Sequence, residues 1–231
     1  MPAKRGRYHH GDLRPALVDA AIAVIAERGV RDFSMAEASR RLGVTTAAPY
    51  RHFADRDELL AAVATRALTV FAAMLSAAAD QADQADQAGQ AGHAGHADRA
   101  HHAGHADAVD TSAERLAAMA GAYVRFAADR RPLFETLFSS GLDKSRHPEL
   151  QRAWEPVDAL LTSVPLEVCD GDSAAAEALS DAIEASAHGY AMLLTDGEYG
   201  QGPDVVDATA DRAIASARAL IAGRRALRTT A

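Results

Sequence analysis

Apolar residues recur at spacings of three and four along most of the chain, which is the period of an amphipathic helix. The stretches 13–28 and 116–127 show this spacing most clearly. Breaking residues then divide the pattern into about nine helical pieces of ordinary length, at Gly29, Gly43, Pro132, Gly141, Pro148, Pro165, Gly171, Gly197 and the pair Gly202-Pro203. We therefore predict an all-α fold of about nine helices.

The composition supports an all-α fold. Alanine supplies about half of the apolar residues, whereas aromatic residues make up only 5% of the chain. Because alanine is the strongest helix former and is depleted in strands, a β-sandwich or β-barrel is disfavoured. A core built on so many small side chains requires helices that approach one another closely.

One segment lacks the large apolar residues found elsewhere. Between Asp80 and Asp110 the chain repeats alanine beside Asp, Gln, Gly or His in a triplet-like pattern. A segment of this kind cannot bury an apolar face, so we expect 80–110 to be a flexible insert that contributes nothing to the fold.

Two short helices joined by a glycine turn are expected near the amino terminus. Ser34 is a good N-cap, and Glu37 follows three residues later, so a capping box predicts a helix over Met35–Leu42. Gly43 permits a sharp turn, and Thr45 can cap a further helix that runs to about Phe53. On spacing alone, this pair is equally consistent with a helix-turn-helix and with an ordinary helical hairpin.

This stretch resembles the TetR family of bacterial transcriptional regulators. The resemblance rests on Phe33-Ser34-Met35, Ala38, Leu42-Gly43-Val44-Thr45, Tyr50, His52-Phe53, the run from Asp55 to Leu60, and a basic amino-terminal arm. It implies a three-helix DNA-binding domain over residues 1–66 and a ligand-binding and dimerisation domain over 67–231. In the second domain, Tyr123–Phe138 and the segment Ala187-His188-Gly189-Tyr190 resemble one class of TetR ligand domain.

The distribution of charge agrees with that division. The formal net charge of −8 alone would argue against a nucleic-acid partner, because phosphate binding requires clustered Lys and Arg. Residues 1–66, however, contain 11 Lys and Arg against 8 Asp and Glu, a net charge of +3. The remainder contains 13 against 24, a net charge of −11.

The resemblance implies a specific set of contacts to double-stranded DNA. Short side chains at the start of the third helix would enter the major groove and contact base edges, namely Thr45, Thr46, Ala47 and Ala48. Phosphate contacts are expected from Tyr50, Arg51, His52 and Arg56. Ser34, at the start of the preceding helix, is also expected to contact DNA. Arg56 would meet a phosphate drawn by the amino terminus of the next helix. The arm residues Lys4, Arg5 and Arg7 would either lie in a minor groove or remain solvated, and Phe53 is expected in the core.

A small-molecule effector is the second implied partner. The large apolar residues of the second domain would line its pocket, together with a few polar groups: Phe71, Met74, Met119, Tyr123, Phe126, Phe134, Leu137, Phe138, Trp154, Leu161, His188 and Met192. An ordinary helical core would explain the same residues, and for any one of them it is the simpler explanation. No cofactor is implied.

The last two long helices, about 173–195 and 203–223, resemble the dimerisation pair of the family. Their apolar residues would form a four-helix interface between two subunits: Leu179, Ile183, Leu193, Leu194, Ile214 and Leu220. A homodimer would read two half-sites of a palindromic operator. We expect a repressor that an effector releases from that operator.

A cluster of histidines offers an alternative function. His93, His96, His101, His102 and His105 place five imidazoles in a short stretch, and imidazole is a common ligand of transition metals. The alternative is therefore a metal-responsive regulator or a metal-binding protein. Alanine and glycine around them fix no coordination geometry, and we assign no metal site.

Other classes of protein receive little support. No phosphate-binding glycine loop or nucleophile elbow indicates an enzyme. The basic amino terminus leads into Asp12, Arg14 and Asp19 rather than into an apolar run, so we expect neither a signal peptide nor a membrane span. Cys169 is the only cysteine, which excludes an intrachain disulfide. We expect a cytoplasmic protein.

Overall fold

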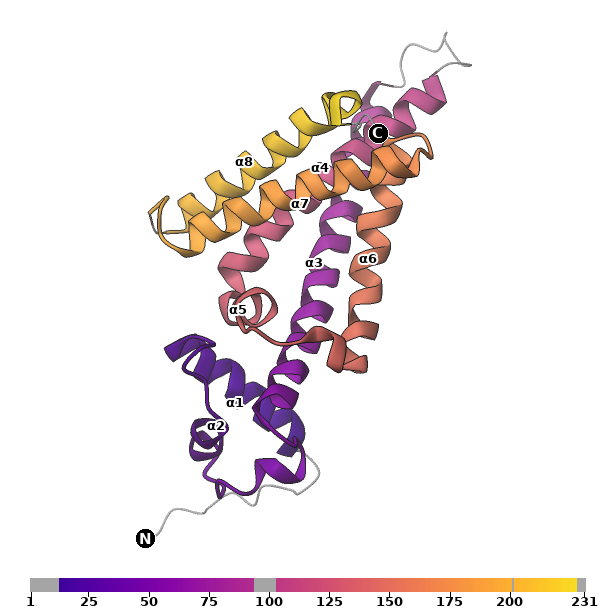
Figure 1. Cartoon of the computed structure of the whole chain (residues 1–231). Helices are drawn as coiled ribbons and strands as arrows, with labels where there is room; N and C mark the ends of the chain where they lie inside the picture. Colours follow the sequence, from indigo (N-terminus) through magenta and orange to yellow (C-terminus); the bar gives the residue numbers. More distant parts are fainter. Residues whose placement is uncertain (1–12, 94–102, 201, 228–231) are drawn as a thin grey trace. The chain divides into compact units, whose positions relative to one another are not determined.

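The computed structural model describes residues 13–93, 103–200 and 202–227 of the chain. Within those residues it contains eight α-helices, three short 3₁₀ helices and no strand (Figure 1). The α-helices are α1 (Leu13–Arg28), α2 (Met35–Arg41), α3 (Arg56–His93), α4 (Ala103–Asp129), α5 (Arg131–Ser139), α6 (Pro148–Val168), α7 (Ser173–Thr195) and α8 (Pro203–Ala222). The 3₁₀ helices are η1 (Pro49–Arg51), η2 (Lys144–Arg146) and η3 (Arg224–Leu227). The all-α prediction is confirmed, with one α-helix fewer than expected in the described part of the chain.

The chain divides into two compact units. The first comprises Met1–Leu68 with Arg131–Ala153, and the second comprises Thr69–Arg130 with Trp154–Ala231. Helix α3 begins in the first unit and ends in the second. Helix α5, which the sequence grouped with the larger domain, belongs to the first unit.

Most helix boundaries follow the predicted breaking residues. Helix α1 has the expected bounds and ends at Gly29, whose φ of 79° lies in the left-handed region. Helices α7 and α8 match the predicted ranges to within one residue. Pro165 was expected to mark a joint, but α6 continues through it to Val168.

The first unit is built around the buried face of α1. Leu17, Val24 and Ile25 on α1 are almost fully buried, as are Leu59 and Phe53 on the segment that follows α2. The prediction that Phe53 belongs to the core is confirmed. Because burial of large apolar side chains is the main stabilising contribution to folding, this core fixes α2 and the start of α3 against α1.

Helix α2 begins and ends as the sequence predicts. The Ser34 Oγ accepts a hydrogen bond from the Glu37 backbone N–H at 3.3 Å, and Ser34 has an extended backbone, as an N-cap requires. The Glu37 carboxylate forms ion pairs with Arg28 and Arg40. After the helix, Gly43 adopts a φ of 66°, which reverses the chain at little steric cost.

The third helix of the helix-turn-helix is shorter than predicted. Instead of an α-helix over Thr45–Phe53, the chain forms a turn closed by a hydrogen bond from Ala48 N to Thr45 O at 3.0 Å, followed by η1. Pro49 explains the difference. It has no N–H to donate to Thr45 O, and its ring clashes with that carbonyl in an α-helix, so the segment adopts the tighter 3₁₀ form.

In the second unit, α4 packs against both α7 and α8 (Figure 1). Gly121 on α4 allows the close approach. A Cβ atom built at this glycine would lie 2.8 Å from two side-chain carbons of Ile214 on α8. The prediction that small residues bring helices close together therefore holds at this contact.

Both ends of the alanine-rich repeat are helical rather than flexible. Residues 80–93 extend α3, and 103–110 begin α4; residues 94–102 lie outside the described part of the chain. Two aspartates of the repeat contact α4. The Asp83 carboxylate lies 3.5 Å from the Arg115 guanidinium, and the Asp86 carboxylate accepts a hydrogen bond from Thr111 at 2.5 Å.

A third helix joins this polar network. The Glu167 carboxylate on α6 accepts hydrogen bonds from the Ser112 hydroxyl at 2.7 Å and from Arg115 at 2.9 Å. Arg115 therefore connects α3, α4 and α6. The first turns of the repeat thus contribute to the fold, contrary to expectation.

The stretch Arg56–Ala88 of α3 is long and apolar enough to cross a membrane by length and composition alone. A buried core helix passes the same test, and half of the most apolar window, with a mean hydropathy of 1.8, is buried inside the protein. We interpret α3 as a core helix.

Candidate nucleic-acid interface and ligand core

The segment after Gly43 presents a row of short side chains to solvent. Thr45, Thr46 and Ala47 are exposed, and Ala48 is half-buried. The buried ring of Pro49 anchors this segment to the first unit. The four residues predicted to contact base edges therefore lie together on a firmly held turn.

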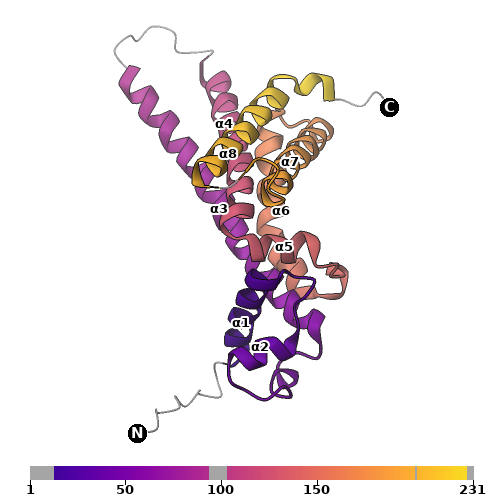
Figure 2. The same ribbon diagram turned by 90° about the vertical axis from the view of Figure 1, so that its left-hand side faces the viewer.

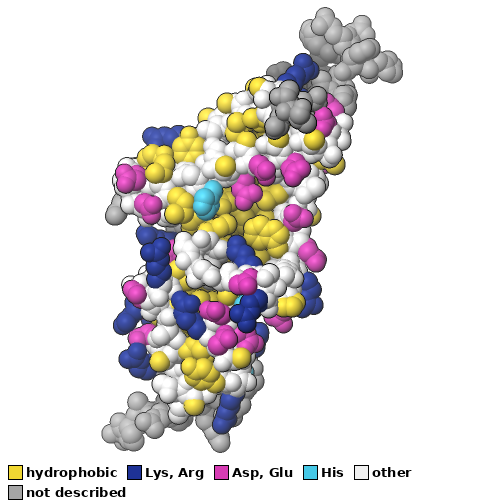
Figure 3. Space-filling view, viewed as in Figure 1, with side chains coloured by type: hydrophobic (Ala, Val, Ile, Leu, Met, Phe, Trp, Pro, Cys, Tyr) yellow, Lys and Arg dark blue, Asp and Glu magenta, His cyan; other side chains and the backbone are white. Residues whose placement is uncertain are grey.

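Two of the predicted phosphate contacts lie on the same surface. The Tyr50 side chain is 59% exposed, and Arg51 is exposed beside it. His52 is half-buried. Lys4, Arg5 and Arg7 lie outside the described residues. In Figure 3, Lys and Arg side chains are interspersed with Asp and Glu side chains over the region of α1 and α2, whereas Asp and Glu side chains predominate over α7.

Arg56, a predicted phosphate contact, has hydrogen-bond partners within the protein. Its guanidinium donates hydrogen bonds to the Val30 carbonyl at 2.9 Å and to the Phe33 carbonyl at 3.2 Å, and lies 5.9 Å from the centre of the Phe33 ring. At the amino terminus of α3, the Asp55 carboxylate accepts a hydrogen bond from the Glu58 N–H at 2.8 Å. The Arg56 guanidinium and the Glu58 N–H therefore already have partners within the protein.

Further ion pairs hold α1 and α2 together. Arg41 donates hydrogen bonds to both oxygens of Glu27, at 2.8 and 2.6 Å. The hydrogen bond from Arg41, supported by its charge, lowers the pKa of the Glu27 carboxyl. Ser34, a predicted DNA contact, is exposed and serves as the N-cap of α2.

Four of the predicted ligand residues form one cluster in the second unit. Phe71 contacts Tyr123 edge-on at a centroid distance of 5.1 Å and Phe126 at 4.8 Å. A hydrogen bond of 2.9 Å joins the Tyr123 hydroxyl to His188 Nδ1. Burial and, to a smaller extent, the charge of Glu184 raise the pKa of the Tyr123 phenol, which therefore keeps its proton. This tyrosine–histidine pair places polar atoms within an apolar core.

The other predicted ligand residues are more dispersed. Met119 is buried, whereas Trp154, Leu161, Met192 and Met74 are half-buried in the second unit. Phe134, Leu137 and Phe138 lie on α5 in the first unit, where the two phenylalanine rings contact each other at 4.9 Å. The structure thus does not gather the twelve residues into one compact unit.

The residues predicted to form the dimer interface differ in exposure. Leu179, Ile183 and Leu194 are buried by helices of the same chain, so they are not available to a second subunit. Ile214 and Leu220 are half-buried, and only Leu193 is largely exposed, at 42%. Sequence reasoning chose the large residues, whereas the solvent-facing surface of α7 and α8 also contains small ones, at Ala185, Ala208, Ala215 and Ala219.

The histidines of the repeat lie where no side chain is described. Among the residues whose side chains the structure describes, no group of three or more His, Cys, Asp or Glu could hold a metal ion. The structure therefore adds no support to a metal-responsive function.

Two known protein families match separate parts of the chain. Residues 17–63 match the family described as bacterial regulatory proteins, tetR family. Residues 116–217 match the tetracyclin repressor-like carboxy-terminal domain. The first match includes the turn at 45–51, and the second includes Tyr123 and His188. No curated protein matches the chain significantly.

Solved structures show the same fold. A protein of unknown function from Rhodococcus sp. RHA1 is 24% identical, with a TM-score of 0.62 over 92% of this chain and 98% of that chain. The TetR family transcriptional regulator PfmR from Thermus thermophilus is 18% identical, with a TM-score of 0.55 over 86% of this chain and 97% of that chain. At these identities the similarity concerns the fold alone.

Proposed function

The chain belongs to the TetR family and is a DNA-binding transcriptional regulator, and from this premise we propose that it is a repressor released from a palindromic operator by a small, largely apolar effector. TetR regulators are intracellular and non-enzymatic, and we propose that this one acts in the cytoplasm. The exposed turn at 45–51, anchored by Pro49, is the observation that best supports DNA reading. We assign DNA binding to residues 1–66 and effector binding and dimerisation to 67–231.

In this proposal the exposed turn enters the major groove. The hydroxyls of Thr45 and Thr46 hydrogen-bond base edges, and the methyl groups of the two following alanines contact thymine methyls. Tyr50 and Arg51 contact phosphates, with His52 beside them. The 3₁₀ geometry keeps this reading segment short, so few base pairs are read by one subunit.

Dimerisation supplies the remaining specificity. We propose that α7 and α8 of two subunits form a four-helix interface. The solvent-facing small residues Ala185, Ala215 and Ala219 would allow close packing around Leu193. Leu193→Arg should convert the dimer to a monomer in light-scattering measurements and weaken operator binding, whereas Thr69→Arg, an exposed position on α3, should do neither. If light scattering shows that the unsubstituted protein is already a monomer, the proposed dimer interface is wrong.

The effector is proposed to bind in the second unit near Phe71, Tyr123, Phe126 and His188. The aromatic rings would contact its apolar part, and the tyrosine–histidine pair would orient a polar group. Release requires that the effector bind the DNA-free state more tightly, by about 1–3 kcal/mol in typical allosteric proteins.

The experiment that tests the proposal has two steps. Duplexes bound by the purified protein are selected from a random pool, and compounds are then screened for release of the selected duplex. A near-palindromic selected sequence and a compound that releases it would support a repressor. Operator affinity that stays constant across a broad panel of apolar compounds would count against effector release.

A further inference from the structure

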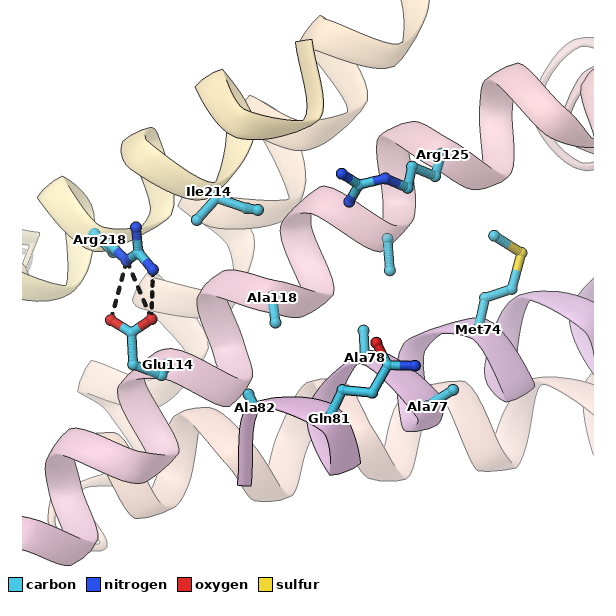
Figure 4. A pocket seen from close by; sticks show the side chains of 11 residues that line it. Met74, Ala77, Ala78, Gln81, Ala82, Glu114, Ala118, Arg125, Ile214 and Arg218 are labelled. Carbon is cyan, nitrogen blue, oxygen red and sulfur yellow. Dashed lines mark hydrogen bonds and ion pairs between the residues drawn. The ribbon is translucent and has the colours of Figure 1, made fainter. Parts of the chain in front are cut away.

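A groove separate from the aromatic cluster lies in the second unit between α3, α4 and α8 (Figure 4). Its volume is about 620 Å³, within the range of small-molecule sites, which is roughly 300–1,000 Å³. Ala118 and Ala122 of α4 lie along the groove, Met74 lines it from α3, and Ile214 lines it from α8. Of the residues predicted to line an effector pocket, only Met74 is among those that line it.

The packing of the three helices explains why the groove exists. Gly121 lets α8 approach α4 closely, which leaves Ile214 and Arg218 beside the small side chains of α4. Along the groove, α3 contributes mostly alanines, at Ala77, Ala78 and Ala82 (Figure 2). The alanines between these helices are too small to fill the space. The apolar part of the groove is therefore lined by alanine methyl groups, Ile214 and the flexible Met74, with the polar side chain of Gln81 beside them. A methionine adapts to apolar chains of different shapes.

Two arginines give the groove its polar character. Arg218 donates to both oxygens of Glu114, with contacts of 3.0, 3.2 and 2.6 Å, so it is held in a two-point ion pair. Arg125 has one contact of 3.2 Å to Asp207, whose side chain is 69% exposed. A single ion pair to an exposed carboxylate contributes little to stability, because water and salt screen it. The Arg125 guanidinium can therefore exchange this partner for the carboxylate of a ligand.

We propose that this groove binds an amphipathic carboxylate, which is a molecule with an elongated apolar body and one terminal carboxylate. The carboxylate pairs with Arg125, and the apolar body lies along Ala118 toward the Arg218–Glu114 pair. The axial rise from residue 125 to residue 114 is about 16 Å, which sets the length of the body. Two guanidiniums and one carboxylate line the groove, although residues 67–231 have a net charge of −11. Because Asp207 is not among the lining residues, an incoming carboxylate would take its place as the partner of Arg125.

Binding to the full-length protein tests this site without DNA, so the result is independent of repressor function. The probes are decanoate and, as a counter-probe with the same chain length, decyltrimethylammonium. The readout is the NMR signal of ¹³C-methyl-labelled methionines, in which Met74 is assigned by its loss in Met74→Leu. We expect decanoate to shift the Met74 signal saturably and decyltrimethylammonium to leave it unchanged.

Two substitutions separate the carboxylate contact from the apolar contact. Arg125→Gln should weaken decanoate binding about tenfold, because it removes a charge-assisted hydrogen bond, whereas Arg130→Gln, on an exposed residue just beyond α4, should have no effect. Ala118→Phe should fill the groove and abolish binding. Equal binding by Arg125→Gln and the unsubstituted protein, equal binding of the two probes, or an unshifted Met74 signal would overturn the proposal.

Discussion

A substitution at Arg56 tests whether this arginine stabilises the amino-terminal unit or binds DNA. In Arg56→Met, the aliphatic part of the side chain is retained and the guanidinium is removed. The variant therefore lacks the hydrogen bonds to the Val30 and Phe33 carbonyls. Hydrogen bonds that involve a charged group contribute about 1.5–3 kcal/mol each. Since 36% of the Arg56 side chain is exposed, water replaces part of this contribution, and we expect a total loss of about 2 kcal/mol in the free energy of unfolding.

The assays are urea denaturation, a thermal melt and a salt titration of DNA binding. The expected loss corresponds to a fall in Tm of about 4–8 °C for a chain of this size. The slope of log K against log salt should not change, because only the removal of a phosphate-binding cation reduces it, by about 0.9 for each phosphate. Arg51→Met is the matched control. It should leave the Tm unchanged, because Arg51 is exposed, and reduce the slope by about 0.9 for each subunit that contacts DNA.

The opposite pattern would refute this reasoning. If Arg56→Met unfolds like the unsubstituted protein and reduces the salt slope as much as Arg51→Met does, then Arg56 contacts phosphate in the complex. Its hydrogen bonds to the loop between α1 and α2 would then have no measurable energetic weight.

Three further predictions concern stability. Tyr123→Phe should lower the free energy of unfolding by about 1 kcal/mol, because it removes the buried hydrogen bond to His188; urea denaturation measures this loss, and unchanged stability would contradict it. The lowered pKa of Glu27 means that its ion pair with Arg41 stabilises the fold above the pKa of the unfolded state and is lost as the pH falls through the folded pKa. Glu27→Gln should therefore reduce the fall in Tm between about pH 5 and pH 3, and a Tm–pH curve parallel to that of the unsubstituted protein would exclude the effect. Gly43→Ala should lower the free energy of unfolding by about 1–2 kcal/mol, because an alanine is strained at the left-handed φ of 66°. No neighbouring atom lies within reach of the added Cβ, so the backbone strain is the only cost. A stabilised variant in the same denaturation assay would contradict this reasoning.

The sequence predicted helix ends well where one residue type controls the backbone. Ser34 caps α2, and Gly29 and Gly43 adopt the positive φ that ends each of the first two helices. The third helix was predicted too long, because a cap at Thr45 was expected to start a helix that ran through Pro49 to about Phe53. The missing N–H of that proline determined the local geometry instead.

Tertiary partners were harder to predict from the sequence. Helical spacing identifies a residue as apolar but does not say which helix covers it. Both Leu179 and Leu193 lie on α7 and were predicted to face a second subunit, yet Leu179 is buried within its own chain and Leu193 is exposed. The role of Asp83 depends on Arg115, which is 32 positions further along the chain. The repetitive composition around Asp83 gave no indication of that contact.

The most direct test of the central claim compares specific and non-specific DNA binding at one salt concentration. Fluorescence anisotropy would measure the Kd for the duplex selected from a random pool and for a scrambled duplex. We predict that the unsubstituted protein prefers the selected duplex by a factor of at least about 10³. Thr45→Val and Thr46→Val should reduce this ratio and leave the Kd for the scrambled duplex unchanged. Equal Kd values of the unsubstituted protein for both duplexes would contradict sequence-specific reading by the turn at 45–51.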